Sequence, residues 1–521
     1  MEMKMERQWI AICFGGAAAL VLLIWAWEVL NWVWPKKLEK CLRVQGLKGN
    51  SYRPFLGDQY ESGKLIREAL SKPININADI KDRVIPHILK TFRDHGKNSF
   101  MWVGRIPRVH ITEPEQIREV LTKYYRFQKN HHSFDPITKH LLTGIGSLEG
   151  EPWAKHRRVI NAAFHFEKLK LMLPAFYESC HDLVSKWESK VPDSGSAEVE
   201  VWHDIETLTA DVISRTLFGS NYEEGKRIFE LMRELTVLTI QVIRSVYIPG
   251  RRFLPTKRNN RIRAIDKEAR VRIKGIINNK MKAMKAGEVT SDDFLGILFG
   301  MHVNEIQQGN YQSAGMRIEE IIGECKLFYF AGQDSTSTLL VWTMVILSRF
   351  PEWQARAREE VLQAFGDKKP DYDGISRLKI VTMILYEVRG LDPPGGEGSK
   401  VAHEATKSGG VSIPAGVQAM FPPILLHQDP EIWGKDAREF KPERFWEGVL
   451  KATKNQGSFF PFSLGPGMSM GQNFALWEAK MPMALILLPF SFELSPSYKH
   501  TPLTLITLQP QHGAHLVLHR A

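Results

Sequence analysis

Cysteine is scarce in this chain of 521 residues. The four cysteines, Cys13, Cys41, Cys180 and Cys325, lie far apart. No pair has the short spacing of a zinc site, and a small domain held together by disulfides needs more of them. The scarcity excludes both classes and suits a reducing compartment. It also leaves the chain beyond Cys325 without any thiol.

Acidic residues are in the minority, with 58 Asp and Glu against 69 Lys and Arg and a net charge of +11. The basic residues are scattered, and aromatic residues do not alternate with them as they do on many surfaces that bind nucleic acid. We therefore predict no nucleic-acid partner. The charge favours attraction to an anionic membrane face or to an acidic protein partner.

Charge is absent altogether from Trp9 to Trp27, a run of 19 residues. A helix of this length is about enough to cross the hydrocarbon core of a bilayer. Trp25, Trp27, Trp32 and Trp34 lie at its end, as is typical of a membrane interface. A cleavable signal peptide is the alternative, although its apolar core is usually shorter. We predict a transmembrane anchor over residues 9–34.

A basic segment follows the anchor and contains Lys36, Lys37, Lys40, Arg43 and Lys48. This excess over the two cations that precede the anchor places the bulk of the chain in the cytosol. Residues 35–60 are basic and rich in Gly and Pro, which predicts a hinge. The globular body then covers residues 61–521.

The body shows no internal repeat and is mostly helical in pattern. Apolar residues recur with a period of 3.6 as far as about residue 350, for example over 164–184 and 228–246. Short strand-like runs follow after residue 410. Residues 390–410 contain six glycines and no apolar alternation, so we predict a flexible loop there. The predicted fold class is mainly α with a minor β region.

One long helix is predicted from Met316 to Arg349, ended by Pro351. Its second half is apolar all round and should cross the core. Its middle carries AGQDSTST at residues 331–338. A glycine inside a helix costs about 1 kcal/mol, and Ser or Thr can bond back to the helix and bend it. The cluster is therefore either a packing kink or a groove that faces a ligand.

Trp153 and Arg157 are four residues apart, so on a helix they share one face. Both side chains are hydrogen-bond donors only, and a guanidinium can hold a carboxylate with two bonds. The pair predicts a carboxylate site. A surface stack of Trp on Arg is the alternative.

A glycine-rich loop that leads into a helix covers Phe459 to Lys480, with the sequence FFPFSLGPGMSMGQNFALWEAK. Glycine lets a backbone pass close to a flat ligand. The loop resembles the haem-binding loop of cytochromes P450, Phe-x-x-Gly-x-Arg-x-Cys-x-Gly. Phe462, Gly465 and Gly471 are in register with that pattern. Together with the anchor, the Trp153 pair and the 331–338 cluster, the resemblance extends over nearly the whole chain and is closest to plant, membrane-anchored enzymes that oxidise terpenoids or hormones.

The resemblance implies the P450 fold and haem b as the cofactor. It implies that Trp153, Arg157 and Lys400 hold the haem propionates, and that Ala331, Gly332, Phe462, Gly465 and Gly471 border the haem. Asp334, the hydroxyl of Ser335 and Thr336 match the motif that relays protons during oxygen activation. The implied partners are a membrane, an NADPH-dependent P450 reductase and a hydrophobic small-molecule substrate. The implied location is the endoplasmic reticulum membrane, with a single span and a cytosolic haem domain.

The chain departs from the family pattern on one side of the haem. Ser469 stands at the position of the axial cysteine, where the family uses a thiolate. Gly467 replaces the loop arginine, and Gly390 replaces the arginine of the Glu-x-x-Arg motif that begins at Glu387. Pro482 falls inside the following helix, where proline costs about 3 kcal/mol. A serine hydroxyl is a weak, hard ligand, so the metal position is predicted to lack its thiolate.

Neither Cys325 nor Arg389 is expected to replace the missing cysteine or arginine. Cys325 lies about three turns before Ser335 on the helix expected at the opposite haem face. Arg389 lies two residues after Glu387, about 200° round the helix, and should not replace a partner three residues on. Arg444, the third member of the buried charge network, is present.

Two functions follow as hypotheses. The first is a haem-dependent monooxygenase that hydroxylates a hydrophobic small molecule, terpenoid or hormone-like, with O2 and electrons from a reductase, and that is impaired because Ser469 replaces the thiolate. The second is an inactive P450-like pseudoenzyme that binds a ligand or partner at the membrane.

Overall fold

The computed structural model describes residues 25, 27, 29–54, 56–129, 136–193, 195–245, 253–287, 293–307, 316–366, 368–392, 397–453, 455 and 457–521. Residues 9–24, 26 and 28 of the predicted anchor lie outside these residues. Within them, no helix combines the length and apolar character needed to cross a membrane.

Helices dominate, as predicted. After a π-helical turn η1 (Val29–Val33), they are α2 (Trp34–Val44), α3 (Gln59–Leu70), α4 (Lys81–Val84), α5 (Pro86–His95), α6 (Pro114–Thr122), α7 (Gly150–Ala163), α8 (Phe166–Glu188), α9 (Val201–Phe218), α10 (Tyr222–Ile243), α11 (Lys257–Lys285), α12 (Phe294–Gln307), α13 (Ile318–Leu347), α14 (Pro351–Phe365), α15 (Tyr372–Arg377), α16 (Lys379–Leu391), α17 (Pro423–His427), α18 (Pro430–Trp433), α19 (Val449–Ala452) and α20 (Gln472–Leu487).

The strands form one larger and three smaller sheets. They are β1 (Lys48–Gly49), β2 (Ser99–Val103), β3 (Ile106–His110), β4 (Phe127–Gln128), β5 (Ser196–Glu200), β6 (Gly398–Ala402), β7 (Thr406–Ser408), β8 (Val411–Ile413), β9 (Gln418–Phe421), β10 (Phe490–Leu494), β11 (Pro502–Thr504), β12 (Leu508–Pro510) and β13 (His515–Arg520). The order β1-β2-β3-β9-β6-β4 gives a mixed six-stranded sheet, and β10-β13-β5 gives an antiparallel one.

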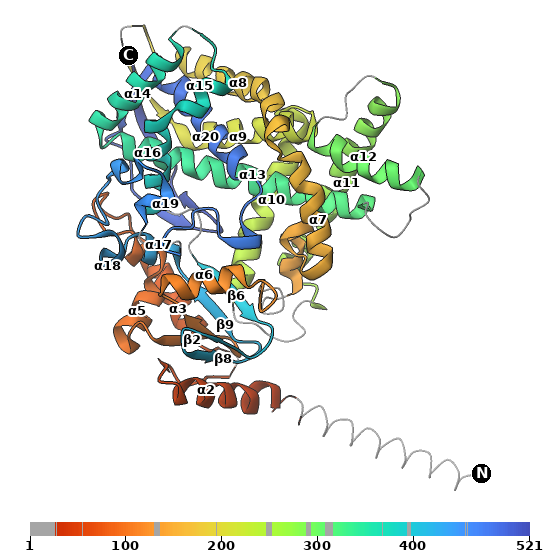
Figure 1. Ribbon diagram of the computed structural model, residues 1–521, viewed down its shortest axis with the longest axis vertical. Coiled ribbons are helices and arrows are strands. Elements are labelled where there is room, and N and C mark those ends of the chain that lie inside the picture. The colour runs from red at the N-terminus through yellow and green to blue at the C-terminus, as the bar shows by residue number, and fades with distance from the viewer. Residues whose placement is uncertain are drawn as a thin grey trace.

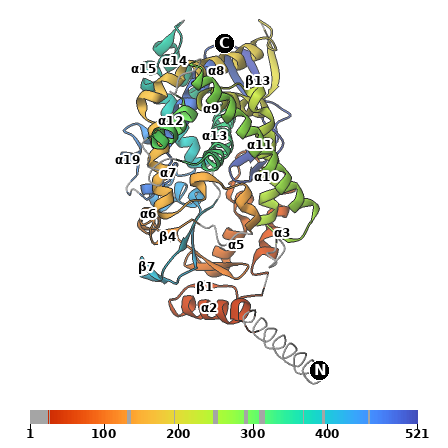
Figure 2. The same cartoon turned by 90° about the vertical axis from the view of Figure 1, so that its right-hand side faces the viewer.

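The helices gather in one part of the molecule, and the six-stranded sheet lies at the other, with α2 beyond it (Figure 1). The turned view shows the same arrangement, with α2 and β1 at the base and α13 within the group of helices (Figure 2). Each part has its own cluster of buried side chains. The segment predicted as a hinge contributes to the second cluster through Leu38, Leu42, Leu47 and Tyr52.

Helix α13 confirms the predicted long helix and is the centre of the larger core. Residues 339–347 are all buried, which agrees with their uniformly apolar pattern. Phe350 and Pro351 end this helix and begin α14, because proline fits the first turn of a helix and not its interior. Helix α20 nevertheless continues through the buried Pro482.

The predicted loop at residues 390–410 is partly wrong. Helix α16 extends to Leu391, and β6 and β7 occupy residues 398–402 and 406–408. Strand β6 pairs along its length with β9. That pairing with a distant strand supplies the order that the glycine-rich local sequence lacks, and it fixes Lys400 in a strand.

Glu387 and Arg444 form a buried ion pair without the arginine that Gly390 replaces. Arg444 Nε lies 3.0 Å from a Glu387 carboxylate oxygen, and the Lys441 amide donates to the same carboxylate at 2.9 Å. Beside them, a cavity of about 10 Å³ borders Gly390 and Phe459. Burial raises the pKa of Glu387 to about 7, although Arg444 opposes the shift. This carboxylate therefore has too little positive charge around it.

We expect Gly390→Arg to stabilise the fold in a pH-dependent way. A Cβ at residue 390 would lie 3.6 Å from the Phe459 ring, an ordinary contact. Because the pKa of Glu387 is raised from 4.5 to about 7 in the folded state, the folded state holds a proton that the unfolded state releases. The original chain should therefore lose up to about 3 kcal/mol of stability as pH rises through this window.

Gly390→Arg should remove most of that loss, as measured by denaturant unfolding at pH 5 and pH 7.5. Gly390→Gln is the matched control, since it adds a polar side chain without charge and should leave the pH dependence unchanged. Equal stabilisation at pH 7.5 by both substitutions would contradict the electrostatic explanation and favour simple packing.

Candidate functional site

A cavity of about 470 Å³ lies between α7, α9, α13, α16, β6 and the loop before α20. Most of the predicted site residues line it: Trp153, Arg157, Ala331, Gly332, Ser335, Thr336, Lys400, Phe462, Ser469 and Gly471. Asp334 and Gly465 are not among the lining residues. Lys129, Arg389 and Glu478, which the sequence did not indicate, are.

Four cationic side chains, Lys129, Arg157, Arg389 and Lys400, line this cavity. Among the described residues, no Asp or Glu lies within ion-pair distance of any of the four. Burial lowers the pKa of Lys129 to about 8 and also lowers the pKa of Lys400 and of Arg157. The charge of Glu149 opposes the shift at Lys129 and at Lys400. The described lining thus gathers four basic side chains, so the cavity favours an anionic ligand.

Glu478 is the one carboxyl group among the described residues that line the cavity. Its side chain comes from α20, and the residue is 1% exposed. Burial raises the pKa of Glu478 well above its usual value, and the neighbouring Thr336 hydroxyl opposes the shift. The charged form of Glu478 is therefore disfavoured. A ligand with more than one negative charge would complement the cavity.

Helix α7 brings Trp153 and Arg157 to the cavity on one face, as their spacing predicts. The Trp153 ring lies 5.9 Å from both the Arg157 guanidinium carbon and Lys129 Nζ. On the adjacent face of α7, His156 Nδ1 lies 2.5 Å from Glu324 Oε1 on α13, and both residues are buried. This contact fixes α7 against α13.

Helix α13 forms one wall of the cavity through its AGQDSTST cluster. A Cβ at Gly332 would lie 2.3 Å from Ile213 Cδ1, so glycine allows α9 to approach closely. The Ser335 hydroxyl donates to the Ala331 carbonyl at 2.9 Å. The cluster thus packs closely against α9 and lines the cavity, and its contact with a ligand stays a prediction.

Asp334 lies on α13, but its side chain bonds to residues of the C-terminal hairpin and does not line the cavity. Its carboxylate accepts from Thr507 Oγ1 at 2.6 Å and from Gln509 Nε2. Burial raises its pKa, and these two donors oppose the shift. Asp334 therefore ties the β11–β12 hairpin to α13, and its role in proton relay stays a prediction.

The loop at residues 462–471 keeps the frame of the predicted haem loop. The Ser469 amide donates to the Phe462 carbonyl at 2.9 Å, which closes the loop. Gly465 has a φ of +65°, and a Cβ there would lie 3.0 Å from the Thr122 backbone of α6. Gly465 therefore packs the loop onto α6 instead of facing the cavity. Ser469 is exposed on the cavity side.

The cavity fits one part of haem and not another. A flat, largely apolar ring with two carboxylates suits the glycine-lined walls and the four unpaired cations. The hydroxyl of Ser469 does not suit an iron centre that requires a thiolate. Cys325 is fully buried on α13 and is not among the residues that line the cavity, and burial raises the pKa of its thiol.

The sequence held a partial signal for one of the missed residues. Arg389 was expected not to pair with Glu387, and it does not; the same 200° rotation carries it to the cavity. Lys129 precedes a segment outside the described residues and carries no motif. Glu478 directly follows the apolar run at residues 474–477 and gives no sign of facing a cavity.

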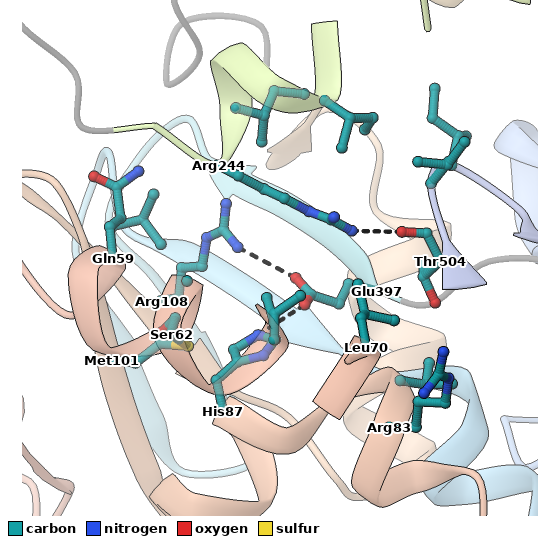
Figure 3. Close-up of a pocket in the computed structure, with 18 residues that line it drawn as sticks. Gln59, Ser62, Leu70, Arg83, His87, Met101, Arg108, Arg244, Glu397 and Thr504 are labelled. Carbon is teal, nitrogen blue, oxygen red and sulfur yellow. Dashed lines mark hydrogen bonds and ion pairs between the residues drawn. The ribbon is translucent and has the colours of Figure 1, made fainter. Parts of the chain in front are cut away.

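A second cavity, of about 300 Å³, lies between α3, α5, the end of α10 and the turn after β11. In it, Arg108 and His87 both point to Glu397, at 3.3 and 2.9 Å, while Arg244 reaches the Thr504 carbonyl (Figure 3). Arg83 also lines it. Although burial opposes the shift, the charges of His87 and Arg108 lower the pKa of Glu397 to about 2. The surroundings of this carboxylate are therefore positive.

Comparison with known proteins agrees with this geometry. The sequence model of the family described as Cytochrome P450 matches residues 77–517. The chain is 74% identical to 7-deoxyloganic acid hydroxylase of Catharanthus roseus over 521 residues, covering 99% of this chain and 100% of that protein. It is 52% identical to secologanin synthase 1 of the same plant over 518 residues, covering 99% of both chains. With its helical core, glycine-rich loop and cationic cavity, the chain belongs to the cytochrome P450 family.

Proposed function

We propose that this chain is a plant P450 of terpenoid oxidation that retains its haem and substrate cavities but has strongly impaired monooxygenase activity. One observation carries the proposal: the cations, the glycine loop and the α13 wall converge on one cavity in which Ser469 occupies the ligand position. Haem would supply the redox chemistry there. The residues of this chain bind and orient the ring and shield it from water.

The weakness lies in the ligand side chain. A thiol ionises near neutral pH when assisted, and the thiolate donates electron density that favours O–O cleavage. A serine hydroxyl holds its proton and donates little. Gly467 and Gly390 remove two further cations from the same side. The wall formed by Ser335 and Thr336 is preserved. Oxygen access and substrate binding should therefore be retained even where turnover is lost.

The alternative function is a pseudoenzyme that binds an apolar ligand or partner without oxygen chemistry. Helix α20 is continuous through Pro482, and the loop at Ser469 is closed. The fold therefore tolerates these departures from the family pattern, as a pseudoenzyme that only binds a ligand would require. Both functions place the body in the cytosol beside the endoplasmic reticulum, held by residues 9–34. The first also requires an NADPH-dependent reductase.

The substrate class is a terpenoid that carries a carboxylate. The relative at 74% identity is named for an acid. The second cavity offers Arg83, Arg108 and Arg244 against the single carboxylate of Glu397 among its described lining residues, together with apolar walls (Figure 3). The turn from Thr504 to Thr507 connects this cavity to α13, because Thr507 bonds to Asp334.

Restoring the thiolate should restore only part of the activity. Ser469→Cys supplies the ligand, but Gly390 still leaves Glu387 short of positive charge and Gly467 still leaves the loop without its cation. We expect product from 7-deoxyloganic acid to rise from background in Ser469→Cys and to rise several-fold more in Ser469→Cys/Gly390→Arg/Gly467→Arg. The measurement is product formation in microsomes with co-expressed reductase and NADPH.

Ser469→Ala is the matched control and should equal the original chain. Full activity of the single Ser469→Cys variant would show that the two missing cations do not matter. Substantial turnover by the original chain that is lost in Ser469→Ala would contradict the proposed impairment.

Arg244→Gln should weaken the binding of acid substrates. Arg244 is exposed and donates to the neutral carbonyl of Thr504, so its removal should not disturb the core. We expect the affinity for 7-deoxyloganic acid to fall roughly fivefold, as for the loss of one charge-assisted contact in a partly solvated site. The methyl ester should bind both forms equally, as calorimetric titration would show.

The exposed Arg93 on α5 provides a control of equal charge, and Arg93→Gln should leave both affinities unchanged. If Arg244→Gln weakens the acid and the ester alike, the residue shapes the cavity and does not recognise a carboxylate.

A further inference from the structure

We propose that Arg389 is a carboxylate-binding residue of the haem cavity that takes over the position of the cation lost at Gly467. The inference rests on the proposed haem cavity but not on iron ligation or turnover. It assigns a ligand contact to a side chain that the sequence pattern predicts not to pair with Glu387.

Arg389 is a buried cation that lacks a counter-charge. It is 4% exposed, and its Nε has no hydrogen-bond partner among the described residues. Its Nη2 donates to the Pro461 carbonyl, and its guanidinium carbon lies 4.0 Å from the centre of the Phe462 ring. Burial lowers the pKa of Arg389 to about 10, so it stays charged at neutral pH. Buried arginine is normally paired with a carboxylate or another anion.

The cavity supplies the place for that anion. Arg389 and Gly467 line the same cavity, from α16 and from the loop. A Cβ at Gly467 would meet no atom within 4 Å, so the space beside the loop is open. A guanidinium has five donors in a planar fork. Among the described residues, the Arg389 side chain donates to the Pro461 carbonyl, which leaves other donors of the fork for a ligand carboxylate. Burial raises the pKa of Glu478 well above its usual value, which disfavours the charged form that would pair with Arg389.

The competing explanation is structural: Arg389 joins α16 to the loop through Pro461 and Phe462. A structural role affects every ligand of the cavity equally. A carboxylate-binding role affects only ligands that carry carboxylates. Iron-free protoporphyrin IX and its dimethyl ester have the same ring and differ only in these groups, and neither involves Ser469 as an iron ligand.

The experiment is fluorescence titration of the full-length protein in detergent micelles with each porphyrin. We expect the original chain to prefer the free acid. Arg389→Gln should lower the affinity for protoporphyrin IX about tenfold or more, as expected for a charge-assisted bond in a buried site, and should leave the dimethyl ester unchanged. Arg389→Gln/Gly467→Arg should recover the affinity for the acid.

Arg158→Gln is the matched control, because Arg158 lies next to Arg157 on α7 but is exposed and does not line the cavity. If Arg389→Gln fails to fold, the effect of Gly467→Arg on the affinity for protoporphyrin IX can be compared in two backgrounds. The gain in affinity should be smaller in the original chain, where Arg389 already binds the carboxylate. It should be larger in the Arg389→Lys variant. Equal loss for acid and ester, or no preference of the original chain for the acid, overturns the proposal. Loss of turnover with intact porphyrin preference would count against the proposed enzyme activity alone.

Discussion

Uncompensated positive charge inside a cavity is the constraint on which the rest of this structure depends. Four cations from α7, α16, β6 and the segment before α7 surround one space, and burial there disfavours the charged form of Glu478. A buried charge without a partner costs several kcal/mol. Among the four, Arg389 is the buried cation, and Lys129, Arg157 and Lys400 are half-buried. Contacts of α13 fix the surrounding walls, through His156 with Glu324 and through Asp334 with Thr507. An anionic ligand would offset the free-energy cost of burying this positive charge.

The departures from the family pattern affect the chemistry more than the frame. The loop at Ser469 still closes on Phe462, α20 still passes through Pro482, and Glu387 still pairs with Arg444. What changes is charge and ligand type: the chain lacks a cation at residue 467, a cation at residue 390 and a thiolate at residue 469. Binding of a ring with carboxylates depends on the remaining cations. Oxygen activation depends on the missing thiolate.

Much of the fold and site could be predicted from local sequence. The apolar run after residue 338 identified α13, and the four-residue spacing of Trp153 and Arg157 gave their shared face. These features depend on helical periodicity, which is a local property. Strand β6 could not be predicted in this way, because its pairing partner β9 is distant and its own glycines resemble a loop. The orientation of Arg389, Glu478 and Asp334 likewise depends on distant contacts.

The central claim is that the cavity binds haem while Ser469 fails to provide the thiolate. The most direct test is haem content together with the reduced-minus-reduced-CO difference spectrum of the membrane-expressed protein. The account predicts bound haem with a CO band that lacks the strong red shift of thiolate ligation. A strongly red-shifted band would contradict it by showing that another sulfur reaches the iron. Absence of haem would contradict the assignment of the cavity and favour the pseudoenzyme.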